Sequence, residues 1–157
     1  MHKNKSFITK YTRIFADIPK KEFISFFIFD KIYLGDDIMD CLFCKIIAGD
    51  IPSYKVYEDD LALAFLDINP TSSGHTLIIP KKHFKDMDDI DIDTLNHIFK
   101  VAKKLKKVLE EKLKCDGISL CQNNGCVQDV KHFHLHLIPK YKNQSKLSLE
   151  EVYKLIK

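Results

Sequence analysis

Three histidines alternate with apolar residues in the run HFHLHLIP, which spans residues 132–139. Successive side chains of a β-strand point to opposite faces of its sheet, so a period of two places the three imidazoles on one face. Neighbouring rings on that face lie about 6.5 Å apart along the strand. A neutral imidazole can attack phosphorus, and a protonated ring nitrogen can donate a hydrogen bond to a phosphoryl oxygen. The run therefore predicts a phosphoryl-transfer site, with a metal site lacking catalysis as the alternative.

This run and several others in the same order resemble the histidine triad (HIT) family, whose signature alternates three histidines with apolar residues. The resemblance covers roughly residues 40 to 141 and is closest to the small bacterial nucleotide-hydrolase branch. The other matching segments are residues 41–52, 65–68, 74–83 and 123–125. The family's transferase branch has glutamine at the last triad position, where this chain has His136. The resemblance therefore implies a hydrolase.

The resemblance also implies roles for individual histidines. His134, the middle triad residue, matches the nucleophile that forms a nucleotidyl-histidine, and His136 matches a phosphate contact. His75 matches the fourth histidine often found beside the triad; the alternative for it is a surface residue at the end of a strand.

A purine nucleotide pocket follows from the same resemblance. Asp67 matches the acid that hydrogen-bonds the ribose hydroxyls, and a carboxylate accepts two such bonds well. Asn123 matches an amide beside the phosphate, and Gly125 permits close backbone approach. The apolar walls around the base match Phe43, Ile46 and Ile68, each of which could instead belong to the ordinary core.

The loop before the triad departs from the family pattern. The familiar loop is two residues longer and supplies glycine and hydroxyl groups that often meet phosphate. Here residues 126–131 read CVQDVK. Asp129 would repel a phosphate if it pointed inward, so the preference for the leaving group is expected to differ.

A second set of residues has the chemistry of a metal site. Cys41 and Cys44 have the Cys-x-x-Cys spacing of zinc ligands. The resemblance adds His83 and His132, which would complete a closed, structural Cys₂His₂ zinc site. The alternatives are two unligated core cysteines or a redox pair.

Composition sets the broad class. The 157 residues are 45% hydrophobic and 30% charged, which is typical of a soluble globular protein. A net charge of +3 gives no argument for nucleic acid, and no apolar run reaches the roughly 20 residues of a membrane helix. Five cysteines, an odd number, without a convincing secretory signal favour the cytoplasm.

Two parts of the chain are expected to differ in organisation. Residues 1–38 are either a misassigned upstream extension, with Met39 as the true start, or a loosely attached arm. Residues 39–157 are expected to form one HIT domain of α+β class, with an antiparallel sheet of about five strands. The expected strands are residues 54–58, 62–66, 75–80, 117–122 and 132–141. A long helix capped by Asp93 or Thr94 should run to about Leu113, with short helices at 41–48 and 148–157.

The sequence analysis leads to a ranked set of functions. The first is hydrolysis of purine nucleoside 5'-phosphoramidates or related mononucleotide adducts through a nucleotidyl-histidine. The alternatives are a dinucleoside polyphosphate hydrolase, or a nucleotide- or zinc-binding interaction module with little turnover. Because the family commonly dimerises, a homodimer is expected; no nucleic-acid or membrane partner is expected.

Overall fold

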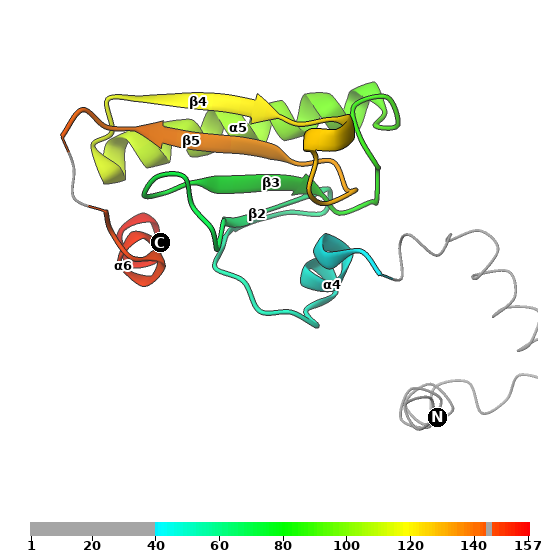
Figure 1. Ribbon diagram of the computed structural model, residues 1–157, viewed down its shortest axis with the longest axis horizontal. Coiled ribbons are helices and arrows are strands. Elements are labelled where there is room, and N and C mark those ends of the chain that lie inside the picture. Colours follow the sequence, from blue (N-terminus) through cyan, green and yellow to red (C-terminus); the bar gives the residue numbers. More distant parts are fainter. Residues whose placement is uncertain (1–39, 144–145) are drawn as a thin grey trace, which may run out of the picture. The chain divides into compact units, whose positions relative to one another are not determined.

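The structure, a computed structural model, describes residues 40–143 and 146–157, so the expectation about residues 1–38 lies outside the described part. The predicted α+β class, five-stranded antiparallel sheet and long helix are confirmed (Figure 1). In chain order the elements are α4 (Leu42–Ala48), β1 (Lys55–Glu58), β2 (Ala62–Leu66), β3 (Thr76–Pro80), α5 (Ile92–Leu113), β4 (Gly117–Gln122), the 3₁₀ turn η1 (Gly125–Val127), β5 (Leu135–Lys140) and α6 (Leu149–Ile156).

The strands are ordered β1-β2-β3-β5-β4, and every neighbouring pair is antiparallel. This order places β5 between β3 and β4, so that His136 is the cross-strand partner of both Leu77 and Cys121. The triad strand is therefore interior to the sheet, and its side chains are fixed by two neighbours.

The strand expected over residues 132–141 is shorter than predicted, because β5 begins only at Leu135. Pairing with both β3 and β4 ends at this residue. Upstream of it the backbone N–H of Phe133 donates to the Phe84 carbonyl, in a loop, at 2.6 Å. His132 and His134 thus lie in the segment that precedes β5, outside the ladder.

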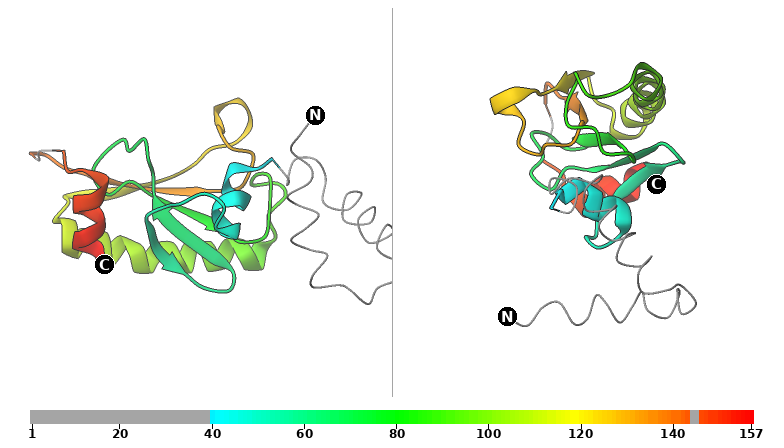
Figure 2. Two further views of the ribbon diagram at one scale, coloured as in Figure 1. Left: turned by 90° about the horizontal axis from the view of Figure 1, so that it is seen from below. Right: turned by 90° about the vertical axis from the view of Figure 1, so that its right-hand side faces the viewer.

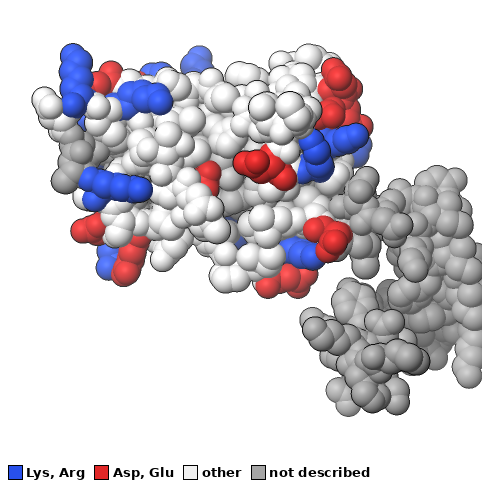
Figure 3. Space-filling view, viewed as in Figure 1, with Lys and Arg blue, Asp and Glu red and all other residues white. Residues whose placement is uncertain are grey.

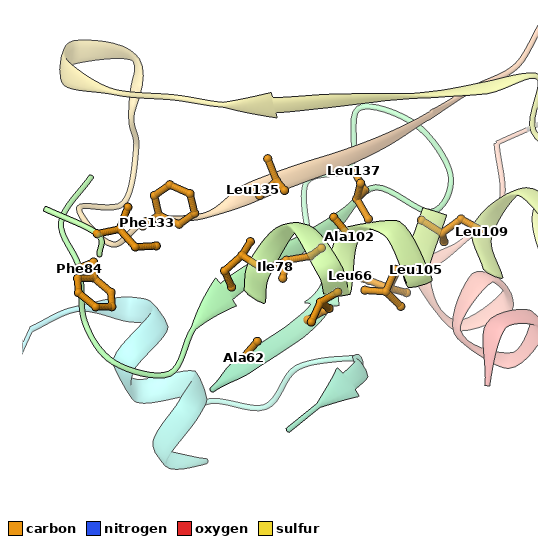
Figure 4. Packing of buried hydrophobic residues seen from close by; sticks show 14 of the residues in the cluster. Ala62, Leu66, Ile78, Phe84, Ala102, Leu105, Leu109, Phe133, Leu135 and Leu137 are labelled. Carbon is orange, nitrogen blue, oxygen red and sulfur yellow. The ribbon is translucent and has the colours of Figure 1, made fainter. Parts of the chain in front are cut away.

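One face of the sheet packs against α5, which runs along it (Figures 1 and 2). Alternate residues of the central strands turn apolar side chains to this side, as the period of two predicts, with Thr76 as a buried polar exception. Figure 4 shows Ala102, Leu105 and Leu109 of α5 over Leu66 and residues of the neighbouring strands. The sheet residues of this core are Ala62, Ala64, Leu66, Ile78, Leu135 and Leu137.

The opposite face carries the histidines and a second, smaller core under α4. Phe43 and Ile46 of α4 pack there with residues of β2 and β3. The alternating sheet residues on this side are Leu63, Phe65, Leu77 and Ile79. Because Phe43 and Ile46 pack against these strand residues, α4, which follows Cys41 and contains Cys44, lies over the site face.

The ends of the helices follow side-chain capping rules, with one correction. Asp91, and not Asp93 or Thr94, caps α5, because its side chain accepts a hydrogen bond from the Thr94 backbone at 2.8 Å. An aspartate three residues before the bonded amide satisfies an otherwise unpaired N–H. The expected end at Leu113 is confirmed, with Lys114 in the left-handed conformation.

Gly74 fixes the loop that precedes β3. Its φ of +86° is one that other residues rarely adopt, and an added Cβ would collide with the Leu113 side chain of α5. The loop therefore lies directly on the end of α5, and the next residue, His75, is placed at the start of β3. Within residues 40–143 and 146–157, no helix has the length and apolar character needed to cross a membrane.

Candidate active site and metal centre

His134 is held in one tautomer by the chain itself. Its Nδ1 lies 2.7 Å from the backbone carbonyl oxygen of His132. A carbonyl only accepts, so Nδ1 carries the proton and Nε2 is left as the ring's lone-pair nitrogen. The side chain is buried, and the edge of the Phe43 ring packs against it at 5.2 Å between centroids. A nitrogen with a free lone pair in a fixed orientation is what nucleophilic attack requires.

His75 and His136 form a hydrogen-bonded pair beside it. His75 Nε2 lies 2.9 Å from His136 Nδ1, and the backbone N–H of Thr71 donates to His75 Nδ1 at 3.2 Å. The amide is always a donor, whereas the Asp67 carboxylate, 3.4 Å from the same nitrogen, makes no hydrogen bond to it, so the His75 proton is assigned to Nε2, from which it is donated to His136. Neutral His136 then carries its own proton on Nε2.

The Nε2 of His136 has no hydrogen-bond partner among the described residues, although it is buried. Leaving a buried donor unpaired costs about 1–3 kcal/mol, so such a group commonly marks a ligand position. The ring of His136 lies 4.9 Å from that of His134. The lone-pair Nε2 of His134 and the unpartnered Nε2 of His136 therefore belong to neighbouring rings. This arrangement suits attack by His134 on phosphorus while His136 donates a hydrogen bond to a phosphoryl oxygen.

Four histidines on this side of the sheet, His75, His132, His134 and His136, favour the neutral form. Burial is the largest cause: it lowers the pKa of His75 and His134, and it lowers the pKa of His132 to about 4. Burial, followed by the charges of His134 and His75, lowers the pKa of His136 to about 4. At neutral pH the site therefore presents uncharged imidazoles.

Asp67 and His75 lie together at the adjoining ends of β2 and β3. Asp67 Oδ1 accepts the Asn69 backbone N–H at 2.9 Å, and Oδ2 lies 3.4 Å from His75 Nδ1. His75 is only 4% exposed, so the alternative of a surface residue is wrong. The half-buried Asp67 carboxylate keeps lone pairs available for a ligand.

The structure places the other predicted nucleotide contacts in different surroundings. Phe43 and Ile46 are buried in the core under α4, so they also do ordinary packing. Ile68 is 71% exposed, which excludes a core role for it. Asn123 follows β4, whose residue Cys121 is opposite His136. Gly125 has a φ of +64° at the start of η1, with open space around it.

The four predicted metal ligands are brought together. One donor atom from each of Cys41, Cys44, His83 and His132 lies within 4.8 Å of the others. His132 Nδ1 is 3.5 Å from each sulfur, and His83 Nδ1 is 3.3 Å from the Cys44 sulfur. Tetrahedral zinc, with bonds of about 2.3 Å to sulfur and 2.0–2.1 Å to nitrogen, would separate these atoms by about 3.5 Å.

The surroundings of this cluster also suit a cation. His132 Nε2 donates to the Pro80 carbonyl at 2.9 Å, which leaves Nδ1 unprotonated toward the sulfurs. Such an outer hydrogen bond orients ligating histidines. Burial, followed by the neighbouring Cys41, raises the pKa of the Cys44 thiol to about 12, and a bound metal would replace the thiol protons. The residues therefore fit a structural zinc ion.

Sequence reasoning missed the groups that orient these side chains. The carbonyls of Pro80 and His132 and the amide of Thr71 set three ring orientations, and no residue type signals a backbone contact. Gln128 was also missed: it is buried, and its Nε2 donates to the Lys85 carbonyl at 2.7 Å. Its place in a polar loop gave no sign of this anchoring role.

Figure 3 shows the sheet face opposite α5 as a broad region with few charged side chains, and most lysines and acids lie around its margin. The histidines and the apolar residues of the second core come to this face. A site with few competing charges suits the neutral imidazoles described above.

Comparisons with known proteins agree with this geometry. A model of the HIT domain matches residues 48–143. An uncharacterized HIT-like protein of Methanocaldococcus jannaschii is 46% identical over 128 residues, which are 74% of this chain and 98% of the relative. An adenosine 5'-monophosphoramidase of Saccharomyces cerevisiae is 46% identical over 109 residues, which are 68% of this chain and 66% of the yeast protein.

A solved structure matches as well. The crystal structure of a Zn-bound histidine triad family protein from Mycobacterium smegmatis has a TM-score of 0.70 and 35% identity, covering 76% of this chain and 91% of that one. The family model spans more than half of the chain, and all three triad histidines lie in or directly before β5, an inner strand of the sheet. The chain therefore belongs to the HIT domain family.

Proposed function

We propose that the protein is a nucleotide hydrolase that cleaves purine nucleoside 5'-phosphoramidates, or related mononucleotide adducts, through a nucleotidyl-His134 intermediate. The observation that carries this proposal is that a lone-pair Nε2 on His134 lies beside a ring, His136, whose buried Nε2 has no hydrogen-bond partner among the described residues. The names of the yeast relatives, adenosine 5'-monophosphoramidases, support the same substrate class.

The reaction would proceed in two displacements at phosphorus. His134 Nε2 forms a bond to phosphorus while the P–N bond to the amine breaks, and the amine leaves with that electron pair and a proton from solvent. His136 Nε2–H donates to a phosphoryl oxygen as its charge grows. Water then attacks phosphorus, releases His134 and returns a proton to solvent, leaving the nucleoside monophosphate.

Zinc would have a structural role beside this site. Cys41, Cys44, His83 and His132 would hold it, and the bound ion would supply folding free energy. Its ligand His132 also provides the carbonyl that accepts from His134 Nδ1. The metal centre and the nucleophile are therefore joined through one residue, although zinc takes no part in the displacement.

The test of the proposed function compares two substrates. Purified protein is offered an adenosine 5'-phosphoramidate and a diadenosine polyphosphate at equal concentrations. We expect faster release of AMP from the phosphoramidate. Faster cleavage of the polyphosphate would favour the dinucleoside hydrolase, and nucleotide binding without turnover of either would favour an interaction module.

A prediction for Asp67 tests the ribose contact. Asp67→Ala should weaken binding of AMP by about 1–3 kcal/mol, because the ribose hydroxyls lose their buried acceptor. Binding of the 2',3'-dideoxy analogue should change much less. Calorimetry on both ligands makes the comparison, with Asp60→Ala, which removes an exposed carboxylate from the turn between β1 and β2, as the control. Equal losses for the two ligands would show that Asp67 does not contact the sugar.

We also propose that the protein is a cytoplasmic homodimer. The outer edge of β4 is unpaired among the described residues, and Leu120 on this strand is 44% exposed. Unpaired strand edges favour association with another chain. The free state of all five cysteines is consistent with a reducing compartment. Sedimentation velocity should give a mass of two chains.

A further inference from the structure

The loop between β2 and β3 is tied to the chain that ends and follows β5. Ser73, which is 4% exposed, takes two hydrogen bonds from that chain: its carbonyl accepts from the Tyr141 hydroxyl at 2.8 Å, and its hydroxyl accepts from the Leu147 backbone N–H at 2.8 Å. The hydroxyl of Ser72 donates to the Pro139 carbonyl at 2.6 Å. Figure 1 shows β5 ending at the end of the sheet where β3 begins. The loop is therefore fixed by contacts distant in sequence.

The same loop supplies the hydrogen bond that sets the tautomer of His75. Thr71, two residues before Ser73, donates its backbone N–H to His75 Nδ1 at 3.2 Å. Ser73 is buried and Tyr141 is half-buried, so water replaces their hydrogen bond poorly when one partner is removed. A change at Ser73 or Tyr141 therefore moves the amide that faces His75.

Asp67 competes with this amide for the same ring nitrogen. Its Oδ2 lies 3.4 Å from His75 Nδ1. An ionised carboxylate only accepts, so it would draw the His75 proton to Nδ1 if the Thr71 amide moved away. His75 Nε2 would then be a lone pair facing His136 Nδ1, 2.9 Å away, and their hydrogen bond would require the His136 proton on Nδ1. In that second arrangement, Nε2 of neutral His136 has no proton to donate to a phosphoryl oxygen.

We propose that Ser73 and Tyr141 are positioning residues for the proposed hydrolysis. They hold the Thr71 amide against His75, and this contact keeps the free proton of His136 on Nε2. The inference rests on the proposed function, and it gives the chain after β5 a part in that reaction. Both residues act through the loop and not through contact with the substrate.

The position of Asp67 depends on a different contact. Its backbone N–H donates to the His75 carbonyl at 3.0 Å, which continues the pairing of β2 with β3 by one step. The proposed ribose contact therefore stays in place when the hydrogen bonds at Ser73 are lost. Such a loss should lower kcat and leave AMP affinity nearly unchanged, because only the donor to the transition state is affected.

Two variants and one control test this role. Tyr141→Phe removes a hydroxyl and keeps the ring, and Ser73→Ala removes the acceptor of the Leu147 amide. For both we expect kcat to fall by about threefold or more, with AMP affinity within about twofold of wild type. Tyr57→Phe is the matched control: it removes a hydroxyl that donates to Asp59 at 2.6 Å, at the other end of β2, and should keep kcat.

Nitrogen NMR of protein labelled with ¹⁵N-histidine gives a readout that a merely structural role would not move. In wild type, His75 and His136 should both be protonated on Nε2. In Tyr141→Phe and Ser73→Ala, both rings should shift together toward protonation on Nδ1. The fall in kcat should follow the fraction of His136 that loses its Nε2 proton. Adding Asp67→Ala to Tyr141→Phe removes the competing acceptor and should return the ring shifts toward wild type.

The outcomes separate this inference from the proposed function. Wild-type His136 protonated on Nδ1 overturns the inference, and so do Tyr141→Phe and Ser73→Ala variants that leave either the ring shifts or kcat unchanged. An equal fall in kcat for Tyr57→Phe also overturns it, because the cause would then be a general loss of stability. If wild-type protein turns over no phosphoramidate, the proposed hydrolysis fails, and the ring shifts alone still test the positioning role.

Discussion

His134→Ala is expected to lose turnover by about three to six orders of magnitude while it still binds AMP. The large loss follows because the covalent step loses the group that attacks phosphorus. Binding should persist because Asp67 and the exposed Ile68 are untouched. The measurement pairs single-turnover kinetics with AMP affinity by calorimetry, so that loss of chemistry is separated from loss of binding.

Controls distinguish this role from a structural one. His134 is buried against Phe43, so truncation to alanine also removes packing. His134→Asn retains an N–H for the His132 carbonyl and fills part of the space, yet lacks Nε2, and it should be equally inactive. His136→Ala should lose only about 10²–10³-fold, because it removes one stabilising donor. His97→Ala removes a half-buried imidazole paired with Asp59 and should keep its turnover.

Removal of the metal ligands is expected to have the second large effect. Wild-type protein purified without chelator should contain about one zinc per chain. Cys41→Ser with Cys44→Ser should abolish this zinc and lower the free energy of unfolding by several kcal/mol, on the order of a 10 °C fall in melting temperature. The four ligands come from α4 and its start, from the loop after β3 and from the segment before β5, so a bound zinc would hold these three segments together.

Elemental analysis and thermal unfolding measure this effect. Cys115→Ser with Cys121→Ser removes two thiols outside the cluster and should keep zinc content and melting temperature close to wild type. Loss of zinc should also reduce kcat more than AMP affinity, since His132 orients the nucleophile through its carbonyl. A wild-type protein that is metal-free, folded and active would remove zinc from this account.

Much of the fold could be predicted because it depends on periodicity. The alternation around Leu135 and Leu137 places the apolar residues toward α5 and the histidines on the other face. The spacing of Ile98, Ala102 and Leu105 likewise defines the buried stripe of the long helix. Such patterns are local in sequence, so they can be read without knowledge of tertiary contacts.

The details that failed have separate physical causes. The triad strand was predicted to begin three residues too early and to end one residue too late, because its start is set by where β3 and β4 stop pairing with it. The cap of α5 was placed too late because Asp91, Asp93 and Thr94 all have side chains that can cap. For Ile68, the exposed side chain excludes only the alternative of a core role, and its predicted contact with the base stays a prediction.

The histidine orientations could not be predicted for a related reason. The backbone carbonyl of His132, two residues earlier, determines which nitrogen of His134 is free. The carbonyl of Pro80, 52 residues away, does the same for His132. Residue types predicted that imidazoles would gather on one face. The proposal that His134 Nε2 is the attacking atom depends on the contact between His134 Nδ1 and the His132 carbonyl.

Trapping the covalent intermediate tests the central claim most directly. Wild-type protein is mixed with an adenosine phosphoramidate labelled at phosphorus and quenched under alkaline conditions, which preserve a phosphorus–imidazole bond. After proteolysis, the label is expected on the peptide containing residues 132–140, attached to His134, and it should be absent from His134→Ala. Label on another residue, or near-wild-type turnover by His134→Ala, would contradict the assignment of His134 as the nucleophile.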